Sequence, residues 1–367
     1  SDLAISSNIT LDTFIPVGGT NSFRVYTTLP NGTADEFPIN DTIQTTAFGC
    51  DSILSGVYTV GTGGDLANVY EAVTALYQCG IKGPVEFRFM AGSYGNLTFN
   101  QNVPGSSTTN TITFTSLSGN PGSVTFASLG DVALTFDNVS NFIFKNVTLN
   151  ATLGTHAVEF KNTCSNIVLY GCNIIADPTT TQTYAGIYRN GTSGSSASLS
   201  NIRIIKNNIS GGYYNIYWYY GGGSSSYMGN NCVIDSNVCT DAYYYGIRLY
   251  YSYTNFNSVS YNKVTCRSVN AYTYFYGISF YYYNNVGEAV GNKVHIRNSA
   301  VNYAYPMYIY YYNNYTNNPF GSMLISNNEI ISEVSSYSYG GIYVYMNTPA
   351  YVLNNSIYAS ASSTAYG

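Results

Sequence analysis

A four-residue pattern recurs through this chain at intervals of roughly thirty residues. Its first and third positions are apolar in every copy, and its fourth position is tyrosine in five successive copies. The copies span residues 158–161, 216–219, 247–250, 278–281, 307–310 and 342–345. Alternation with a period of two predicts a strand that buries one face. Repetition at a nearly constant interval predicts a solenoid in which each copy stacks on the preceding one.

A second apolar stretch follows each copy and ends in a β-branched residue. Two positions before that residue, asparagine recurs as Asn207, Asn262, Asn292, Asn328 and Asn355, with Lys145, Cys172 and Ser236 in the other copies. Asparagine tolerates the left-handed conformation of a tight corner, and amides stacked at a corner can bond to one another along the axis. Loop lengths vary while strands keep register, which fits a parallel β-helix better than a propeller with four strands per blade. We therefore predict an all-β solenoid, a parallel β-helix of about 9–10 coils.

Charge is scarce, because Asp, Glu, Lys and Arg make up only 8% of the chain. The surface must therefore be built from tyrosine (41 of 367 residues), asparagine, serine, threonine and glycine. The net charge of −5 and the absence of a basic run argue against a nucleic-acid partner. No apolar run reaches the roughly eighteen residues of a membrane span. Because Ser1 is not an initiator methionine, we expect a mature or excised part of a longer chain.

Seven cysteines in such a polar chain favour an oxidising compartment, so we expect a secreted or cell-surface protein. Cys50 and Cys79 flank the segment that leads into the solenoid and form the best candidate pair. Two further pairs are close enough in sequence to bridge locally: Cys164 with Cys172, and Cys232 with Cys239. Cys266 is then left over. The alternative is that the thiols are reduced and buried in the core.

Asn-x-Ser/Thr sequons are abundant, although many arise by chance in a chain this rich in asparagine and threonine. They are glycosylation candidates only if the source glycosylates such sites. The candidates are Asn8, Asn31, Asn40, Asn96, Asn138, Asn146, Asn150, Asn190, Asn208, Asn314 and Asn354.

The chain divides into three regions: residues 1–49, residues 50–104 and residues 105–367. In the first, residues 22–28 and 40–46 read as strands. The segment 29–43 resembles the closing hairpin of the Ig-like modules found in large secreted bacterial surface proteins. A complete module needs about one hundred residues, so this is a partial Ig-like β segment whose unpaired strands could be donated to another copy.

The second region carries the pattern of a linker and a solenoid cap. A helix is predicted with Asp65 as N-cap, an apolar face of Leu66, Val69, Val73 and Leu76, and an end at Cys79-Gly80. A strand at 85–90 and the sequence Gly92-Ser93-Tyr94 follow. This order resembles the N-terminal cap of the pectate-lyase-like β-helix superfamily, a resemblance that covers about residues 57–100. It implies a right-handed β-helix and makes polysaccharide cleavage the first enzyme hypothesis.

The residues for such cleavage are missing from the sequence. The resemblance implies clustered aspartates, Gly-His-Gly and Arg-x-Lys for a hydrolase, and none of these motifs occurs. The only histidines, His156 and His295, lie several coils apart, and Asp137 with Lys161 reads as a surface ion pair. We therefore predict no catalytic residue, no metal site and no cofactor, and keep a polysaccharide lyase or hydrolase only as an alternative. Arg189 falls at an inward position, so we expect a local shift of register that removes it from the core.

The fourth position of the pattern forms an outward stripe of tyrosines on successive coils. Its members are Tyr219, Tyr250, Tyr281, Tyr310 and Tyr345. Trp218 instead takes an inward position, which favours core packing over sugar binding. The stripe has three interpretations: a contact between copies, a stabilising aromatic ladder or a platform for sugar rings.

Together these features favour a structural role. We predict a non-catalytic extracellular protein, the repeating unit of a cell-surface fibre, stalk or adhesin, whose partners are other copies of itself. The runner-up is a carbohydrate-binding β-helix that holds a polysaccharide on the tyrosine stripe.

Overall fold

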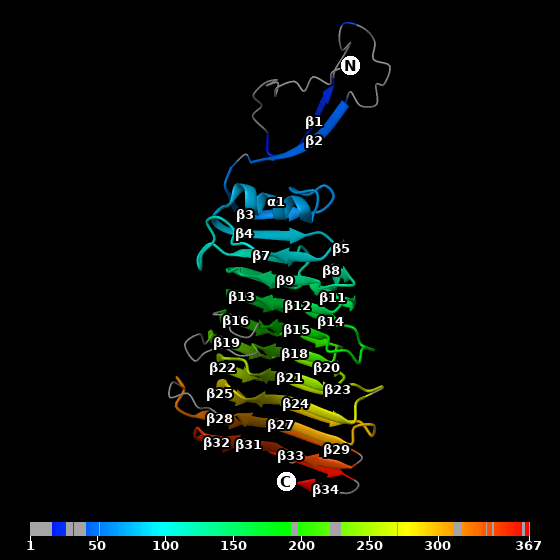
Figure 1. The fold of residues 1–367 in the computed structure, drawn as a ribbon, viewed down its shortest axis with the longest axis vertical. Helices are drawn as coiled ribbons and strands as arrows, with labels where there is room; N and C mark the ends of the chain where they lie inside the picture. The colour runs from blue at the N-terminus through cyan, green and yellow to red at the C-terminus, as the bar shows by residue number, and fades with distance from the viewer. Residues whose placement is uncertain are drawn as a thin grey trace, which may run out of the picture.

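The computed structural model describes residues 17–26, 32, 42–50, 52–191, 197–220, 229–269, 271–311, 318–334, 336–339, 341–361 and 364–366. A two-stranded hairpin and helix α1 lie at one end of a long stack of coils, and strand β34 lies at the other end (Figure 1). Within the stack, each strand pairs in parallel with its equivalent on the next coil, which gives three sheets around one apolar core. This is the architecture of a parallel β-helix, and the predicted all-β solenoid is confirmed at this level.

The three sheets are named here in the order in which the chain first enters them. The first contains β3 (Leu54–Val60), β4 (Ile81–Phe89), β7 (Ile112–Ser116), β10 (Phe142–Lys145), β13 (Cys164–Tyr170), β16 (Leu199–Ile205), β19 (Gly229–Asp235), β22 (Thr254–Ser260), β25 (Asn284–Val290), β28 (Met323–Ser326) and β32 (Ala350–Leu353). The second contains β5 (Gly92–Tyr94), β8 (Val124–Leu129), β11 (Thr148–Leu153), β14 (Asn173–Ala176), β17 (Asn208–Ser210), β20 (Val238–Ala242), β23 (Lys263–Cys266), β26 (Lys293–Arg297), β29 (Glu329–Val334) and β33 (Ser356–Ala361). The third contains β6 (Leu97–Phe99), β9 (Leu134–Asp137), β12 (His156–Lys161), β15 (Ala185–Asn190), β18 (Tyr214–Tyr219), β21 (Tyr245–Tyr250), β24 (Tyr274–Tyr281), β27 (Tyr303–Tyr311), β30 (Tyr337–Tyr339), β31 (Ile342–Met346) and β34 (Thr364–Tyr366).

The repeated four-residue pattern lies in the third sheet and keeps strict register there. Its first position stacks Ile216 on Ile247 and Ile247 on Ile278, and these side chains are fully buried. Its third position stacks Trp218 on Leu249 in the same core. The alternation in the sequence therefore reports the inward and outward faces of this sheet correctly.

An asparagine ladder runs along the corner between the first and second sheets. Each Nδ2 donates to the Oδ1 of the asparagine on the next coil, at distances of 3.0, 3.0, 3.2, 3.1 and 2.8 Å. The ladder comprises Asn207, Asn237, Asn262, Asn292, Asn328 and Asn355. Each of these asparagines also donates to a carbonyl of the preceding coil, as Asn262 does to Ile234 at 2.8 Å.

Two of the residues predicted for the column that contains the asparagine ladder were wrong. Asn237 rather than Ser236 holds the ladder position, because Ile204 pairs with Ile234 and Ile209 with Cys239. Three coils earlier, Val147 rather than Lys145 precedes Cys172 in the column, since Lys145 pairs with Tyr170. The left-handed conformation also belongs to a different residue, the one immediately before the ladder, with φ of 57° at Lys206, 59° at Ser236, 57° at Tyr261 and 54° at Asn327 and Asn354. The asparagine is therefore suited to its place by its axial hydrogen bonds rather than by its backbone freedom.

At the N-terminal end, β1 (Gly19–Tyr26) and β2 (Thr42–Gly49) form an antiparallel pair. The predicted strands at 22–28 and 40–46 overlap them, while most of the hairpin segment 29–43 lies outside the described residues. Helix α1 (Val69–Cys79) follows and ends at Gly80, where φ is 67°. Its N-cap is Asn68, which accepts from the Glu71 amide at 3.0 Å, and not Asp65 as predicted. Asp65 accepts instead from the amide and hydroxyl of Thr59 at 2.7 and 2.8 Å, outside the helix.

The cysteines follow a simpler pattern than the one predicted. Cys50 and Cys79 form a disulfide with a Cα–Cα distance of 5.6 Å, which ties the β1–β2 hairpin to the end of α1. The local pairs are wrong, since Cys164, Cys172, Cys232, Cys239 and Cys266 are free and buried. Cys164 and Cys172 are separated by the whole of β13, roughly 20 Å of strand, whereas a disulfide needs Cα atoms about 4.4–6.8 Å apart. The inward thiols pack in the core, where the Cys164 Sγ lies 3.2 Å from the Lys161 carbonyl.

We expect these five thiols to resist an aromatic disulfide reagent in the native protein. Burial raises the pKa of Cys172, Cys232 and Cys239 to about 12 and that of Cys266 to about 11, so the reactive thiolate is scarce at pH 8. Absorbance should therefore report almost no release from the folded protein and five equivalents after denaturation without a reductant. Reduction before the assay should add the two thiols of the Cys50–Cys79 bridge. A count of three or fewer without reductant would reveal a further bridge.

Candidate functional site

His156, Asp137 and Lys161, which the sequence analysis weighed as catalytic residues, make structural contacts instead. The His156 Nδ1 accepts from the Ala185 amide at 3.0 Å, and burial lowers the pKa of this imidazole to about 4, so it is neutral. Lys161 pairs with Glu159 at 3.1 Å, while Asp137 accepts from Asn162 at 2.6 Å. In the described part of the chain, no three His, Cys, Asp or Glu side chains gather as a metal site would require. No helix among the described residues is long and apolar enough to cross a membrane.

Arg189 lies in the core, which corrects the predicted shift of register. It pairs with Phe160 on one coil and Trp218 on the next, and it is only 2% exposed. Its Nη1 donates to the Phe160 carbonyl at 3.3 Å, and its guanidinium lies 5.3 Å from the ring centre of Tyr220. Burial lowers the pKa of Arg189 to about 10, so the group is still a cation at neutral pH.

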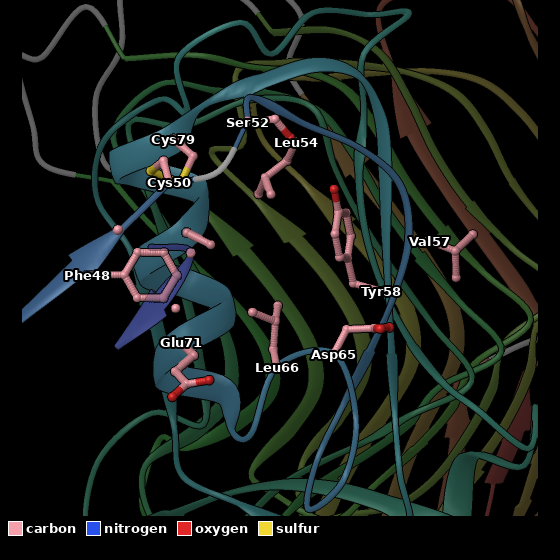
Figure 2. A pocket seen from close by; sticks show the side chains of 14 residues that line it. Phe48, Cys50, Ser52, Leu54, Val57, Tyr58, Asp65, Leu66, Glu71 and Cys79 are labelled. Atoms are coloured by element: carbon pink, nitrogen blue, oxygen red, sulfur yellow. A yellow bond between two sulfur atoms is a disulfide. The ribbon is translucent and has the colours of Figure 1, made fainter. Parts of the chain in front are cut away.

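A cavity of about 360 Å³ lies between helix α1, strand β3 and the hairpin (Figure 2). Phe48, Leu54 and Leu66 line it beside the disulfide. Its two carboxylates are already engaged: Asp65 holds Thr59, and Glu71 accepts from the Ala67 amide at 2.9 Å and from the Thr20 hydroxyl at 3.2 Å. The cavity therefore reads as a packing seam of the N-terminal end rather than as a chemical site.

The candidate site is the outward surface of the third sheet from β18 to β31, which we call the tyrosine face. The predicted stripe is confirmed, because Tyr219, Tyr250, Tyr281, Tyr310 and Tyr345 pair directly on successive coils. Their ring centres are 5.6, 5.6, 5.1 and 5.1 Å apart, and their planes differ by 18°, 40°, 26° and 15°. Three of the four contacts are stacked and the Tyr250–Tyr281 contact is tilted, so the rings pack on one another along the axis.

A second aromatic column, five or six residues before the stripe tyrosines in the sequence, was missed. Tyr214, Tyr245, Tyr276, Tyr305 and Tyr339 stack at 5.3, 4.8, 4.3 and 4.6 Å. A shorter column of Tyr274, Tyr303 and Tyr337 stacks beside it at 4.5 and 5.0 Å. Part of the signal was present, because a tyrosine stands two positions before the apolar start in four copies, although strict alternation would have placed it on the inward face.

Between the stripe and the second column runs a mixed column of Tyr217, Arg248, Ser279, Tyr308 and Tyr343. The Arg248 guanidinium lies 4.2 Å from the ring centre of Tyr245 and 4.4 Å from that of Tyr250. Burial acts to lower the pKa of Arg248, but the surrounding tyrosines, Tyr245 first, outweigh it and raise the pKa above its ordinary value. Next to it, Ser279 leaves a hollow of about 260 Å³ in the tyrosine face.

The sequons fall in different environments. Asn96, Asn138, Asn208 and Asn354 are exposed, whereas Asn146 and Asn150 are half-buried. The Asn150 Oδ1 accepts from the Thr152 amide at 2.9 Å, and the Asn208 Nδ2 donates to Asn173 at 3.2 Å. The side chains of Asn8, Asn31, Asn40, Asn190 and Asn314 lie outside the described set. The accessible glycosylation candidates are therefore the four exposed residues Asn96, Asn138, Asn208 and Asn354.

In comparisons with known proteins, no family model, no curated protein and no solved structure matches this chain. The likeness to the pectate-lyase-like superfamily thus rests on the residues of the N-terminal region alone.

Proposed function

We propose that this chain is a non-catalytic extracellular structural protein, a repeating unit of a cell-surface fibre, stalk or adhesin. In this proposal the β-helix is right-handed and related to the pectate-lyase-like superfamily, and residues 1–49 belong to an Ig-like module. The Cys50–Cys79 disulfide supports an oxidising location. Copies meet through the N-terminal strands and the ends of the solenoid.

The observation that carries the proposal is the direction in which the tyrosine rings face. A sugar platform needs ring faces open to solvent, but the stripe turns its faces onto one another, with centres 5.1–5.6 Å apart. Such stacking, together with the buried asparagine ladder, joins each coil to the next along the axis. The side chains that repeat most regularly therefore strengthen a rod, which favours a structural role over sugar binding.

The ends of the stack offer surfaces for contact between copies. On the last coil, Val352 and Ile357 continue the core columns of Ile325 and Ile330, yet they are 49% and 46% exposed. A further layer of strands would bury this apolar surface. At the opposite end, β1 and β2 pair only with each other among the described strands, so each keeps an open edge.

Sedimentation velocity and negative-stain electron microscopy test this proposal. We expect end-to-end assemblies whose length rises with protein concentration. Val352→Lys should shorten them because it places a charge in the end layer, whereas Tyr351→Lys, on the outward side of the same strand and 58% exposed, should not. A chain that stays a monodisperse monomer at every concentration would sink the proposal.

A further inference from the structure

The hollow in the tyrosine face lies where the mixed column has a serine, Ser279, instead of a large side chain. Ser279 lies in register between Arg248 and Tyr308, and its short side chain stays below the neighbouring rings, which leave it only 2% exposed. Tyr276 and Tyr245 form one wall, stacked at 4.8 Å, and Tyr281 lines the other. Since coils are about 4.8 Å apart, Arg248 and Tyr308 are separated by about 10 Å along the axis. One flat ring fills that separation at ordinary aromatic spacing.

The same hollow carries a positive charge that no carboxylate neutralises among the described residues. The side chains that act on Arg248 are tyrosines rather than carboxylates, and its buried Nε has no hydrogen-bond partner in the part of the chain described. Tyr245 and Tyr250 lie over the guanidinium and the Tyr214 side chain takes one of its hydrogen bonds, so its remaining donors are at its edge. The edge of a guanidinium is the part that binds a carboxylate through two parallel hydrogen bonds.

We propose that this hollow is a binding site for a small aromatic carboxylate. The acid group accepts from the edge of Arg248, and the aromatic ring lies among Tyr276, Tyr281 and Tyr308 over Ser279. Both parts of the ligand are required, because the walls recognise a flat apolar ring and the arginine recognises the charge. The site does not depend on assembly of the chain into fibres, so a negative binding result would not contradict the proposed structural function, and the reverse also holds.

Isothermal titration calorimetry with 4-hydroxybenzoate at neutral pH tests the site on the whole chain. We expect saturable binding with one ligand per chain. Two probes separate the parts of the ligand: 4-methylphenol has the ring without the acid, and glucuronate has an acid on a ring that is not aromatic. Each should bind at least about tenfold more weakly, as loss of a charge-assisted bond or of aromatic packing predicts.

Two variants locate the binding. Ser279→Tyr completes the column and fills the hollow, so affinity should be lost while the melting temperature is kept or raised. Arg248→Gln should weaken binding of 4-hydroxybenzoate at least about tenfold but leave that of 4-methylphenol nearly unchanged. Thr265→Tyr, an outward change of similar size on the second sheet, is the matched control and should bind like the parent.

The proposal is overturned by binding that survives Ser279→Tyr, by glucuronate or 4-methylphenol binding as tightly as 4-hydroxybenzoate, or by no saturation up to about 10 mM ligand. If Ser279→Tyr does not fold, the comparison of the three probes on the parent protein and on Arg248→Gln decides the matter alone.

Discussion

Replacing Asn262 by alanine is expected to destabilise the protein by about 3–6 kcal/mol, a large effect for one uncharged side chain. Asn262 is fully buried in the middle of the ladder. Its Nδ2 donates to the Ile234 carbonyl at 2.8 Å and to Asn292 at 3.2 Å, and its Oδ1 accepts from the amide and the Nδ2 of Asn237 at 3.0 Å each. Alanine leaves the Asn237 amide, one N–H of the Asn237 side chain and the Ile234 carbonyl without these partners in a buried place, and each such group costs about 1–3 kcal/mol.

Urea unfolding followed by circular dichroism measures this loss, and hydrogen exchange shows where it falls. The Asn237 amide should lose its protection first, because its acceptor is the side chain that was removed. Asn208→Ala is the control: this asparagine is exposed on the adjacent strand and makes one side-chain contact, to Asn173 at 3.2 Å. Its cost should stay below about 1 kcal/mol. Equal losses for the two variants would show that the ladder is not what holds the corner together.

The sequence predicted the strands, their order and the tyrosine stripe, because these depend on a period-two alternation that survives changes of loop length. It failed where two registers were chemically equivalent. In the coil of β19 and β20, Val233 and Val238 fit the apolar template as well as Ile234 and Cys239 do, and only the pairing with Ile204 and Ile209 separates them. A shift of one residue then placed Ser236 in the ladder instead of Asn237.

The position of Arg189 shows a different limit. The rule that a buried cation needs a partner was sound, but the partner is a main-chain carbonyl and a tyrosine ring, which no side-chain pattern reveals. The prediction of two local disulfides failed for a similar reason, since closeness in sequence says little about distance once an extended strand separates two cysteines. The hollow at Ser279 could have been found, because the alignment already placed Ser279 between Arg248 and Tyr308 at the variable second position.

Alkaline pH is expected to unfold the protein in a cooperative step above pH 10, because many tyrosines must stay neutral in the folded state. Burial raises the pKa of Tyr77 to about 12, and burial first, followed by neighbouring tyrosines, raises that of Tyr308 to about 12. The same causes raise the pKa of Tyr213, Tyr217, Tyr245, Tyr276 and Tyr305.

The sign follows from proton linkage. Above pH 10 the unfolded chain releases its tyrosine protons while the folded chain retains them, so the folded state binds more protons and stability falls as pH rises. The contribution of each tyrosine is complete below pH 10 and disappears as pH passes the raised pKa. Arg189 acts in the opposite direction, since burial lowers its pKa to about 10, but it is one group against many.

Tyrosinate absorbance and β-sheet circular dichroism recorded over one alkaline titration check this prediction. Most of the absorbance change should come late and coincide with loss of the dichroism signal, at a pH well above the ordinary tyrosine value. Tyr245→Phe removes a buried hydroxyl from the second column and should move the transition to higher pH. Tyr261→Phe, at a site 61% exposed, should leave it in place. Gradual ionisation near pH 10 with the dichroism intact would contradict the prediction, since it would mean that the stacked rings give up their protons without loss of the fold.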